Sequence, residues 1–354
     1  MKVSLNWLNN YIKTTLEPLE LSDKLTDLGL ECTFEKHGVS FSGVVVGEVI
    51  ECNPHEDSDH LSICTVKTDK NSLFNVICGA PNVRAGILVP FAKVGATLDF
   101  GKLKIKETKI RGVVSQGMIC SEKELGVGDS HEGIMVLDEQ CSLGLDFSSI
   151  VNIKEDIVYD IDLTPNRGDC LGHLGVAREI AILENKTISD DYKVVQLETN
   201  KENEKFSIKI SDKDNCLRYS ACIISGVEVK ESPDWLRQSL ESIGQKSINN
   251  IVDAANYVLM DLGHPMHTFD LDKIKSGSID VRCAKKGEKI VALDDVEHSL
   301  SNDNLLICDG YNPIAIAGII GGNDSCVDKN TKNILIESAY FLRNSYKGSL
   351  KLSD

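Results

Sequence analysis

The run VVVGEVIE at residues 44–51 is the first of several short apolar segments that alternate with turn residues. Four similar runs follow, all rich in Val or Ile and bounded by Gly, Pro, Asn, Asp or other polar residues. They are SICTVKT (62–68), LFNVICG (73–79), ILVPFA (87–92) and GIMVL (133–137). Short strands at this spacing are typical of a small β-barrel, which we expect at residues 40–150.

Residues 1–39 predict two short helices. Apolar residues at helical spacing mark each of them: Leu5, Leu8 and Ile12 in the first, and Leu25 and Leu28 in the second. Ser22 is expected to cap the second helix, which ends before Gly29. Because fewer than 40 residues rarely form a core alone, this segment should pack against a later part of the chain.

A helix predicted at residues 171–185, LGHLGVAREIAILEN, is the natural partner of those first helices. One stripe of this helix is formed by Leu174, Ala177 and Ala181. The barrel would then be an insertion in a composite domain made of residues 1–39 and 151–198. The charged residues 190–205 read as a linker.

Residues 199–354 predict a further α+β domain. One helix starts after Ser232–Pro233, ends at Gly244 and has four inward residues: Trp235, Leu236, Leu240 and Ile243. A second helix covers residues 249–263, with four residues on its apolar face: Ile251, Ala255, Val258 and Leu262. Strand-like runs are IDVRCA (279–284), LLICDG (305–310), IAIAGII (314–320) and NILIES (333–338).

Composition favours a reduced cytoplasmic protein. The first residues lack the apolar core of a signal peptide, and no run reaches the roughly 20 apolar residues of a membrane helix. The 12 cysteines are scattered with no CxxC, and several lie in apolar runs as expected for buried free thiols: Cys78, Cys120 and Cys308. The net charge of -16 makes the chain acidic, whereas nucleic-acid binders usually have a basic surface. Any RNA contact must therefore use local basic patches.

Three parts of the chain resemble the bacterial phenylalanyl-tRNA synthetase β subunit, in the order expected for its N-terminal portion. PHEDSDHLSICTV (54–66), ICGAPNVRAGILVPFAKVGATL (77–98) and KIKETKIRGVVSQGMICSEKELGV (104–127) resemble the tRNA-binding OB-fold module of several synthetases. DIDLTPNRGDCLGHLGVAREIA (160–181) resembles the segment that follows this module. INNIVDAANYVLMDLGHPMHTFDLDKI (248–274), LDD (293–295), IAIAGIIGG (314–322) and ILIESAYF (334–341) resemble the editing domain.

The resemblance implies hydrolysis of mischarged tyrosyl-tRNA(Phe). It identifies Glu337 as the carboxylate that reads the tyrosine hydroxyl, and His267 as a residue that positions water or acts as a weak base. Asn256 is implied as a further catalytic-site residue that hydrogen-bonds substrate or water. Gly318, Gly321 and Gly322 are glycines that let the backbone approach a ligand closely. His264 is expected on the surface. Without the resemblance, Glu337 would read equally well as a solvated strand-end carboxylate.

Two substrate-pocket positions depart from the family pattern. Ala255 stands where threonine is common, and Lys246 stands where arginine is common, so a hydroxyl and a bidentate group are lost. These departures leave open an alternative function, a non-catalytic tRNA-binding and subunit-assembly module with an inactive editing pocket.

A cluster of basic residues in the barrel segment is the candidate tRNA-binding site. It consists of Lys93, Lys102, Lys104, Lys106, Lys109 and Arg111. Charges on strand edges are more often solvation, so tRNA binding by this module alone should be weak. The acidic and histidine-rich HEDSDH (55–60) suggests metal binding only superficially, and we expect no metal.

The resemblance also implies partners and cofactors. The β subunit should assemble with an α subunit as an (αβ)₂ heterotetramer that acts on tRNA(Phe), without a membrane. ATP and Mg²⁺ would serve aminoacylation by the α subunit in the holoenzyme, and this part of the β subunit should need no cofactor. Further family modules should follow Asp354, so the editing domain is expected to be truncated at its C-terminal end.

Overall fold

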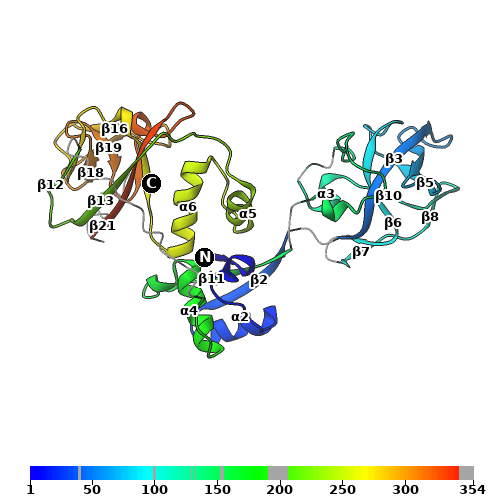
Figure 1. Cartoon of the computed structure of the whole chain (residues 1–354), viewed down its shortest axis with the longest axis horizontal. Coiled ribbons are helices and arrows are strands. Elements are labelled where there is room, and N and C mark those ends of the chain that lie inside the picture. The colour runs from blue at the N-terminus through cyan, green and yellow to red at the C-terminus, as the bar shows by residue number, and fades with distance from the viewer. Residues whose placement is uncertain are drawn as a thin grey trace. The chain divides into compact units, whose positions relative to one another are not determined.

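The computed structural model describes residues 1–38, 41–98, 101–128, 130, 132–151, 155–189 and 206–342. The chain forms two compact units (Figure 1). Unit 1 combines Met1–Phe34 with Val158–Asp354, and unit 2 is Glu35–Ile157. Both units contain helices and strands, so the predicted α+β class is confirmed. The predicted linker at 190–205 lies outside the described residues. No helix in the described ranges is long and apolar enough to cross a membrane.

Unit 2 is built on a six-stranded antiparallel sheet. Its strands are β3 (Ser42–Pro54), β4 (Ser62–Lys67), β5 (Leu73–Cys78), β6 (Leu88–Leu98), β7 (Leu103–Lys104) and β10 (Gly117–Ile119). The order is β10-β6-β3-β4-β5, and β7 pairs with β6. The first four predicted runs correspond to β3, β4, β5 and β6, so these strands are confirmed.

Hydrogen bonds outside the ladder connect the two edges of this sheet. Just before β10, Gln116 donates its N–H to the carbonyl of Asn75 in β5 at 2.8 Å. Ile77 of β5 donates its N–H to Oγ of Ser115 at 3.1 Å. Further elements among the described residues of the unit are β8 (Thr108–Ile110), β9 (Val113–Ser115), α3 (Glu122–Leu125) and a 3₁₀ turn at Phe147–Ser149. Strands β8 and β9 form a hairpin.

The fifth predicted strand, at 133–137, is wrong. Only Leu137 reaches the sheet, through an isolated bridge to Leu88. The side chain of Asn82 takes both backbone hydrogen bonds of Ile134, accepting its N–H at 2.9 Å and donating to its carbonyl at 2.8 Å. The side-chain amide of Asn82 therefore takes the place of a neighbouring strand with which a strand at 133–137 would have paired.

The N-terminal part of unit 1 packs on the segment that follows unit 2. Its elements are β1 (Lys2–Ser4), α1 (Leu5–Leu8), α2 (Pro18–Asp27), β2 (Glu31–His37), β11 (Asp156–Asp162), a 3₁₀ turn (Gly168–Cys170) and α4 (His173–Leu183). The sheet order is β1-β11-β2, with Val3 opposite Tyr159. Helix α4 confirms the predicted helix, and its Ala177 is fully buried.

The expected cap at Ser22 is wrong. Helix α2 begins four residues earlier, at Pro18, because proline at the first helical position has its φ angle already fixed for a helix. Ser22 lies inside the helix and donates its hydroxyl to the carbonyl of Cys32 at 2.7 Å. This bond ties α2 to β2 instead of starting the helix.

Trp7 joins the N-terminal part to the later helix α6 (Asn250–Leu262). Its ring stacks between His173 at 4.0 Å and Tyr257 at 4.2 Å between centroids. Its Nε1 donates to Oδ1 of Asp261 at 2.8 Å. His173 is fully buried and accepts the N–H of Ser4 at 3.1 Å, and burial lowers the pKa of this histidine to about 4. The stack therefore contains a neutral imidazole.

Residues 206–342 form two sheets, a hairpin and two helices (Figure 1). One sheet has the order β12-β15-β18-β19-β20, with strands Ser207–Ile210, Ser278–Cys283, Leu305–Cys308, Pro313–Ile316 and Ile320–Gly321. The other has the order β13-β21-β14, with strands Cys216–Ser225, Asn333–Phe341 and His267–Asp270. Strands β16 (Lys289–Val291) and β17 (Glu297–Ser299) form the hairpin. Two 3₁₀ turns cover Leu271–Lys273 and Asn323–Ser325.

The four strand-like runs predicted in this part are confirmed, and an apolar core joins the two sheets. Phe269 and Leu335 come from the three-stranded sheet, and Val281 and Ile307 come from the five-stranded sheet. All four are at most 2% exposed. Burial of such side chains contributes about 1.5–3 kcal/mol each, so this core holds the two sheets face to face.

Helix α5 (Asp234–Ser242) confirms the helix expected after Pro233, and Leu236, Leu240 and Ile243 are buried. Trp235 is wrongly predicted as inward, because it is 59% exposed. Its ring contacts the edge of Tyr257 in a T-shaped arrangement, with centroids 5.4 Å apart.

Helix α6 confirms the second expected helix but not its apolar face. Leu262 is 39% exposed, whereas Asp253 is fully buried. The hydroxyls of Ser232 and Ser247 both donate to Oδ2 of Asp253, and the N–H of Ile248 donates to Oδ1 at 2.9 Å. These hydrogen bonds compensate the carboxylate for lost water, which the hydrophobic pattern does not anticipate.

Candidate active site

A cavity of about 330 Å³ lies between the two sheets of residues 206–342. Strands β14 and β21 contribute one wall, and β18, β19 and the turn into β20 contribute the other. Most of its lining is apolar. The described lining residues include two ionisable side chains, Glu337 and His267.

These two residues come from neighbouring strands. His267 of β14 lies directly opposite Glu337 of β21 in antiparallel register. Opposed residues point to the same face, with Cβ atoms about 4.5–5.5 Å apart. Alternate residues of β21 share this face, so Ala339 and Phe341 also line the cavity. Strand pairing therefore brings together two groups that are 70 positions apart in the sequence.

Glu337 is 6% exposed and has one protein hydrogen bond to its carboxyl among the described residues. The hydroxyl of Tyr219, in β13, donates to Oε2 at 3.0 Å. Burial raises the pKa of Glu337 to about 7, and the bond from Tyr219 opposes this shift. Burial, and then the charge of Glu337, raise the pKa of Tyr219, so this phenol stays protonated and donates. Within the described residues, Oε1 is left to accept from a ligand.

His267 is a neutral imidazole at physiological pH. Burial lowers its pKa to about 4, because the charged ring would lose its hydration. The ring packs edge-to-face on Phe269, with centroids 4.5 Å apart. A neutral ring can accept a hydrogen bond from water on one nitrogen and donate from the other.

Gly321 supports the imidazole from the opposite wall. A Cβ atom at this position would lie 2.6 Å from Cε1 and 2.7 Å from Nε2 of His267, so no side chain fits. Leu293 of the LDD turn donates its N–H to the carbonyl of Gly321 at 3.0 Å, and its side chain lines the cavity. The turn and the glycine together fix the wall against His267.

The other two predicted glycines have different roles. Gly318 lines the cavity and has a φ angle of +69°, which favours glycine. Gly322 does not line it. A Cβ atom there would lie 2.8 Å from the carbonyl oxygen of Ile314, so this glycine allows close packing of backbone beside the cavity.

Three predicted pocket residues are not among the lining residues. Ala255 and Asn256 lie half-buried in the middle of α6, and Lys246 is exposed in the loop before that helix. That loop is held by Ser247, whose hydroxyl donates to the buried Asp253. The structure thus unites Glu337, His267, Gly318 and Gly321 and leaves these three outside.

Sequence reasoning missed Tyr219, and it placed His264 on the surface without a role. His264 is exposed, but its Nε2 lies 2.8 Å from Oγ of Ser338, next to Glu337 in β21. No local pattern marks Tyr219, because the buried partner of its hydroxyl is 118 positions away.

In unit 2 the predicted basic residues are only partly available. Lys102, Lys104, Lys106 and Lys109 are exposed. Arg111, at the β8–β9 turn, donates from its guanidinium to the carbonyl of Asp57 at 2.6 Å. Lys93 is half-buried, and its charge lowers the pKa of Asp69 as the least of several causes. The exposed members of the predicted basic set are therefore Arg111 and four lysines, Lys102, Lys104, Lys106 and Lys109.

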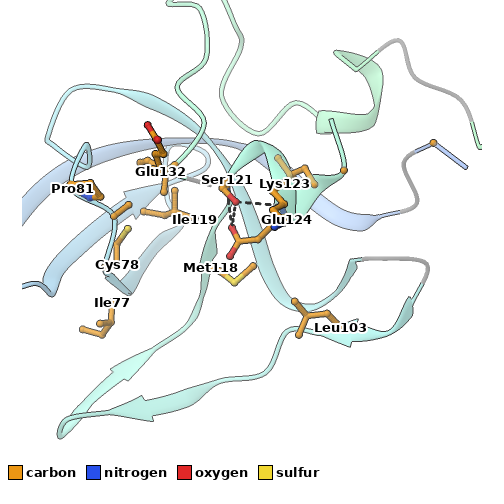
Figure 2. Close-up of a pocket in the computed structure, with 17 residues that line it drawn as sticks. Ile77, Cys78, Pro81, Leu103, Met118, Ile119, Ser121, Lys123, Glu124 and Glu132 are labelled. Carbon is orange, nitrogen blue, oxygen red and sulfur yellow. Dashed lines mark hydrogen bonds between the residues drawn. The ribbon is translucent and has the colours of Figure 1, made fainter. Parts of the chain in front are cut away.

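A second cavity, of about 670 Å³, lies within unit 2 (Figure 2). Figure 2 shows Ser121 hydrogen-bonded to Glu124, with Met118, Ile119 and Lys123 from the same stretch around the space. Lys123 is its one lysine among the described lining residues, and the predicted basic residues do not line it. The cavity and the basic surface are thus different features of the unit.

Among the described residues, one cluster has metal-ligand chemistry: Asp169, Cys170 and Glu179. The guanidinium of Arg167 donates to all three, at 2.9 Å to Asp169, 3.0 Å to Cys170 and 2.8 Å to Glu179. A fixed positive charge therefore already occupies the place that a cation would take. In HEDSDH, His55 accepts the N–H of Asp57 at 3.1 Å, as in a local turn.

Two family profiles match the chain. The profile described as "B3/4 domain" matches residues 215–352, which include the cavity between the two sheets. The profile described as "Putative tRNA binding domain" matches residues 44–146, within unit 2.

Similar proteins were also found by direct comparison. The phenylalanine–tRNA ligase β subunit of Syntrophus aciditrophicus is 44% identical over 352 residues, covering 99% of this chain and 43% of the relative. That of Protochlamydia amoebophila is 43% identical over 344 residues, covering 96% of this chain and 43% of the relative. The chain thus spans less than half the length of these relatives. A crystal structure of an N-terminal fragment of the Pyrococcus horikoshii phenylalanyl-tRNA synthetase β subunit aligns with a TM-score of 0.33 and 18% identity, covering 56% of this chain and 62% of that one.

Proposed function

This chain belongs with the phenylalanine–tRNA ligase β subunits, as a counterpart of their N-terminal region, and we propose that its cavity hydrolyses mischarged tyrosyl-tRNA(Phe). The observation that carries the proposal is the buried Glu337 in the cavity wall, opposite His267. A cavity of about 330 Å³ is near the lower limit for small-molecule sites and suits one amino-acid side chain.

Glu337 supplies the specificity in this proposal. An apolar phenylalanine pocket rejects tyrosine by only about 10²-fold, so a second site must recognise the hydroxyl positively. The tyrosine phenol would donate to Oε1 of Glu337, while Tyr219 holds Oε2. Phenylalanine cannot donate, and leaving the carboxylate desolvated without a partner costs on the order of 1–3 kcal/mol or more.

His267 orients the attacking water. The water oxygen forms a bond to the ester carbonyl carbon, and the bond from that carbon to the tRNA 3′ oxygen breaks. Free tyrosine and the tRNA hydroxyl are the products. An imidazole with a pKa of about 4 is a weak base, so positioning of water supplies more than proton abstraction does. The neutral ring is available for this task across the physiological pH range.

Unit 2 would bind tRNA. We propose that its sheet closes as an OB-fold barrel, and the bonds from Gln116 to Asn75 and from Ile77 to Ser115 support closure. Lys106 and Lys109 would contact phosphates. If each contributes, the Lys106→Ala, Lys109→Ala variant should lower the slope of log affinity against log salt by about 2. Lys70→Ala, at another exposed lysine of this unit, is the matched control.

The partners follow from the family. We propose that the complete β subunit assembles with an α subunit as an (αβ)₂ heterotetramer. ATP and Mg²⁺ would serve aminoacylation there, and the hydrolytic step described above uses this chain's own residues and water.

A competing function is a tRNA-binding and assembly module whose pocket is inactive. The placement of Asn256, Ala255 and Lys246 away from the cavity lining favours it. One comparison in the complete enzyme separates the two functions. Glu337→Ala should slow deacylation of tyrosyl-tRNA and abolish tyrosine binding at this site, while phenylalanine charging stays near normal.

His267→Ala should also slow deacylation but should retain most tyrosine binding, because it removes the water-positioning group and not the reader of the hydroxyl. Equal deacylation by the wild type and Glu337→Ala would reject the editing site and leave the assembly module.

A further inference from the structure

The β3–β4 strand pair carries two cysteines in direct register. Cys52 of β3 lies opposite Cys64 of β4 in the antiparallel ladder. Their Sγ atoms are 3.7 Å apart, with the thiol of Cys64 directed at the sulfur of Cys52. Directly opposed residues in such a ladder have Cα atoms about 4.5–5.5 Å apart, which lies inside the range of about 4.4–6.8 Å that disulfides span.

We propose that Cys52 and Cys64 form a reversible disulfide when the protein meets a hydroperoxide, making this pair a redox modification site. The strands need no change of register for the bond, since the two sulfurs have only to close from contact distance to the roughly 2.05 Å of an S–S bond. The proposal is independent of the editing function, because both cysteines belong to unit 2.

The two cysteines differ in exposure, and this difference gives their sulfurs different roles in the reaction. Cys64 is fully buried, and burial followed by the neighbouring Cys52 raises its pKa. Cys52 is only partly buried, and its sulfur lies 3.8 Å from the carbonyl oxygen of Val83 in the loop between β5 and β6. Cys52 is thus the sulfur that an oxidant reaches first, and Cys64 is the resolving thiol beside it.

The reaction balances with hydrogen peroxide as the oxidant. The Cys52 thiolate attacks one peroxide oxygen, an S–O bond forms, the O–O bond breaks, and the leaving hydroxide is protonated to water. The sulfur of Cys64 then attacks the sulfenic sulfur of Cys52. The S–S bond forms, the S–O bond breaks, and a second water leaves with the Cys64 proton. Two thiols together lose two electrons, and one peroxide gains them.

The test treats the 354-residue chain with hydrogen peroxide, blocks remaining thiols with N-ethylmaleimide, and identifies linked peptides by mass spectrometry after proteolysis. A Cys52–Cys64 peptide that disappears on reduction with dithiothreitol is expected. Cys222→Ser, which removes an exposed cysteine of unit 1, should leave the yield of this peptide unchanged.

Substitution of the resolving thiol gives the sharper result. In Cys64→Ala the linked peptide should be lost, and Cys52 should instead be trapped by dimedone as a sulfenic acid. Cys64→Val, which keeps an apolar side chain of larger volume, should behave alike and guards against a folding defect in the alanine variant. Direct conversion of Cys52 to sulfinic acid in the wild type, with no linked peptide, would overturn the proposal. Oxidation of Cys222 with Cys52 left fully reduced would overturn it too.

Discussion

The phenol of Tyr219 and the carboxyl of Glu337 share a buried hydrogen bond of 3.0 Å, in which tyrosine donates to Oε2. The two strands that carry them are adjacent, with Tyr219 opposite Ala339 and Ala221 opposite Glu337. In the described part of the chain, Cys216 and His267 also lie near the carboxyl, and the thiol of Cys216 has a raised pKa because it is buried. The charge on Glu337 is therefore set by burial and by this one phenol.

The first prediction concerns the pH dependence of tyrosyl-tRNA deacylation. A carboxylate accepts a phenol more strongly than a carboxylic acid does. Because the pKa of Glu337 is about 7, enzyme-dependent hydrolysis should rise with pH through about 7 and then level off. His267, with a pKa of about 4, should cause no further change of the rate with pH in this range. Rates are measured after subtraction of uncatalysed ester hydrolysis, and the rate of Glu337→Gln should not rise with pH in this way.

The second prediction tests the role of the Tyr219 hydroxyl, which donates to Glu337. In Tyr219→Phe the ring is kept and the hydrogen-bond donor is lost, so the pKa of Glu337 should rise further. The rise of the deacylation rate should then occur at higher pH. Activity lost at pH 7 should largely return at about pH 8.5, where the carboxyl ionises again. NMR titration of the Glu337 carboxyl gives the same shift without relying on catalysis. An unchanged titration would mean that Tyr219 does not control the charge.

The third prediction concerns stability. The folded-state pKa of Glu337 is about 7, above its ordinary value of 4.5, so the folded protein binds this proton more tightly than the unfolded chain does. The contribution is complete below about pH 4.5 and is lost as pH rises through about 7, with a size on the order of 3 kcal/mol.

Denaturation followed by tryptophan fluorescence measures this effect in unit 1, which contains both tryptophans, Trp7 and Trp235. Glu337→Gln should remove this part of the pH dependence above pH 5. A wild type and a glutamine variant with the same pH profile would contradict a buried, proton-binding Glu337.

The fourth prediction tests the contact between Gly321 and His267. Gly321→Ala should displace the imidazole, because the added Cβ would lie 2.6 Å from its Cε1. Deacylation should fall, and stability should decrease by about 1–3 kcal/mol. Combining it with His267→Ala should recover much of the lost stability but not the activity. Gly168→Ala is the control, because its Cβ would meet nothing within 4 Å.

Local sequence pattern predicted the strands and helices that bury continuous apolar runs, such as β3 to β6 and α4. It failed where a polar side chain replaces an expected partner. The side chain of Asn82 forms the hydrogen bonds of the Ile134 backbone that a neighbouring strand would form. The hydroxyl of Ser22 in α2 donates to the carbonyl of Cys32 in β2. Strand β13 was missed because most of its residues are exposed or half-buried, so it shows no clear alternation.

The candidate site shows the same limit. Resemblance identified Glu337, His267, Gly318 and Gly321, which the structure gathers at one cavity. It placed Ala255 and Asn256 of α6 at the pocket, but the described lining residues include none from this helix. The hydrophobic pattern did not orient the helix either, because Asp253 and Asp261 are buried on it. Tyr219 lay beyond prediction, because its role exists only after β13 has paired with β21.

The ring stack at Trp7 has a consequence for the order of folding during synthesis. Its indole hydrogen bond reaches 254 positions forward to Asp261, and β1 pairs with β11, about 155 positions later. A ribosome releases roughly 5–20 residues each second, so Trp7 waits on the order of 10–50 seconds before Asp261 leaves the exit tunnel. Unit 2, whose strands pair within Glu35–Ile157, can fold during that interval. Trp7 and β1 therefore reach their native partners only after all residues of unit 2 have been translated.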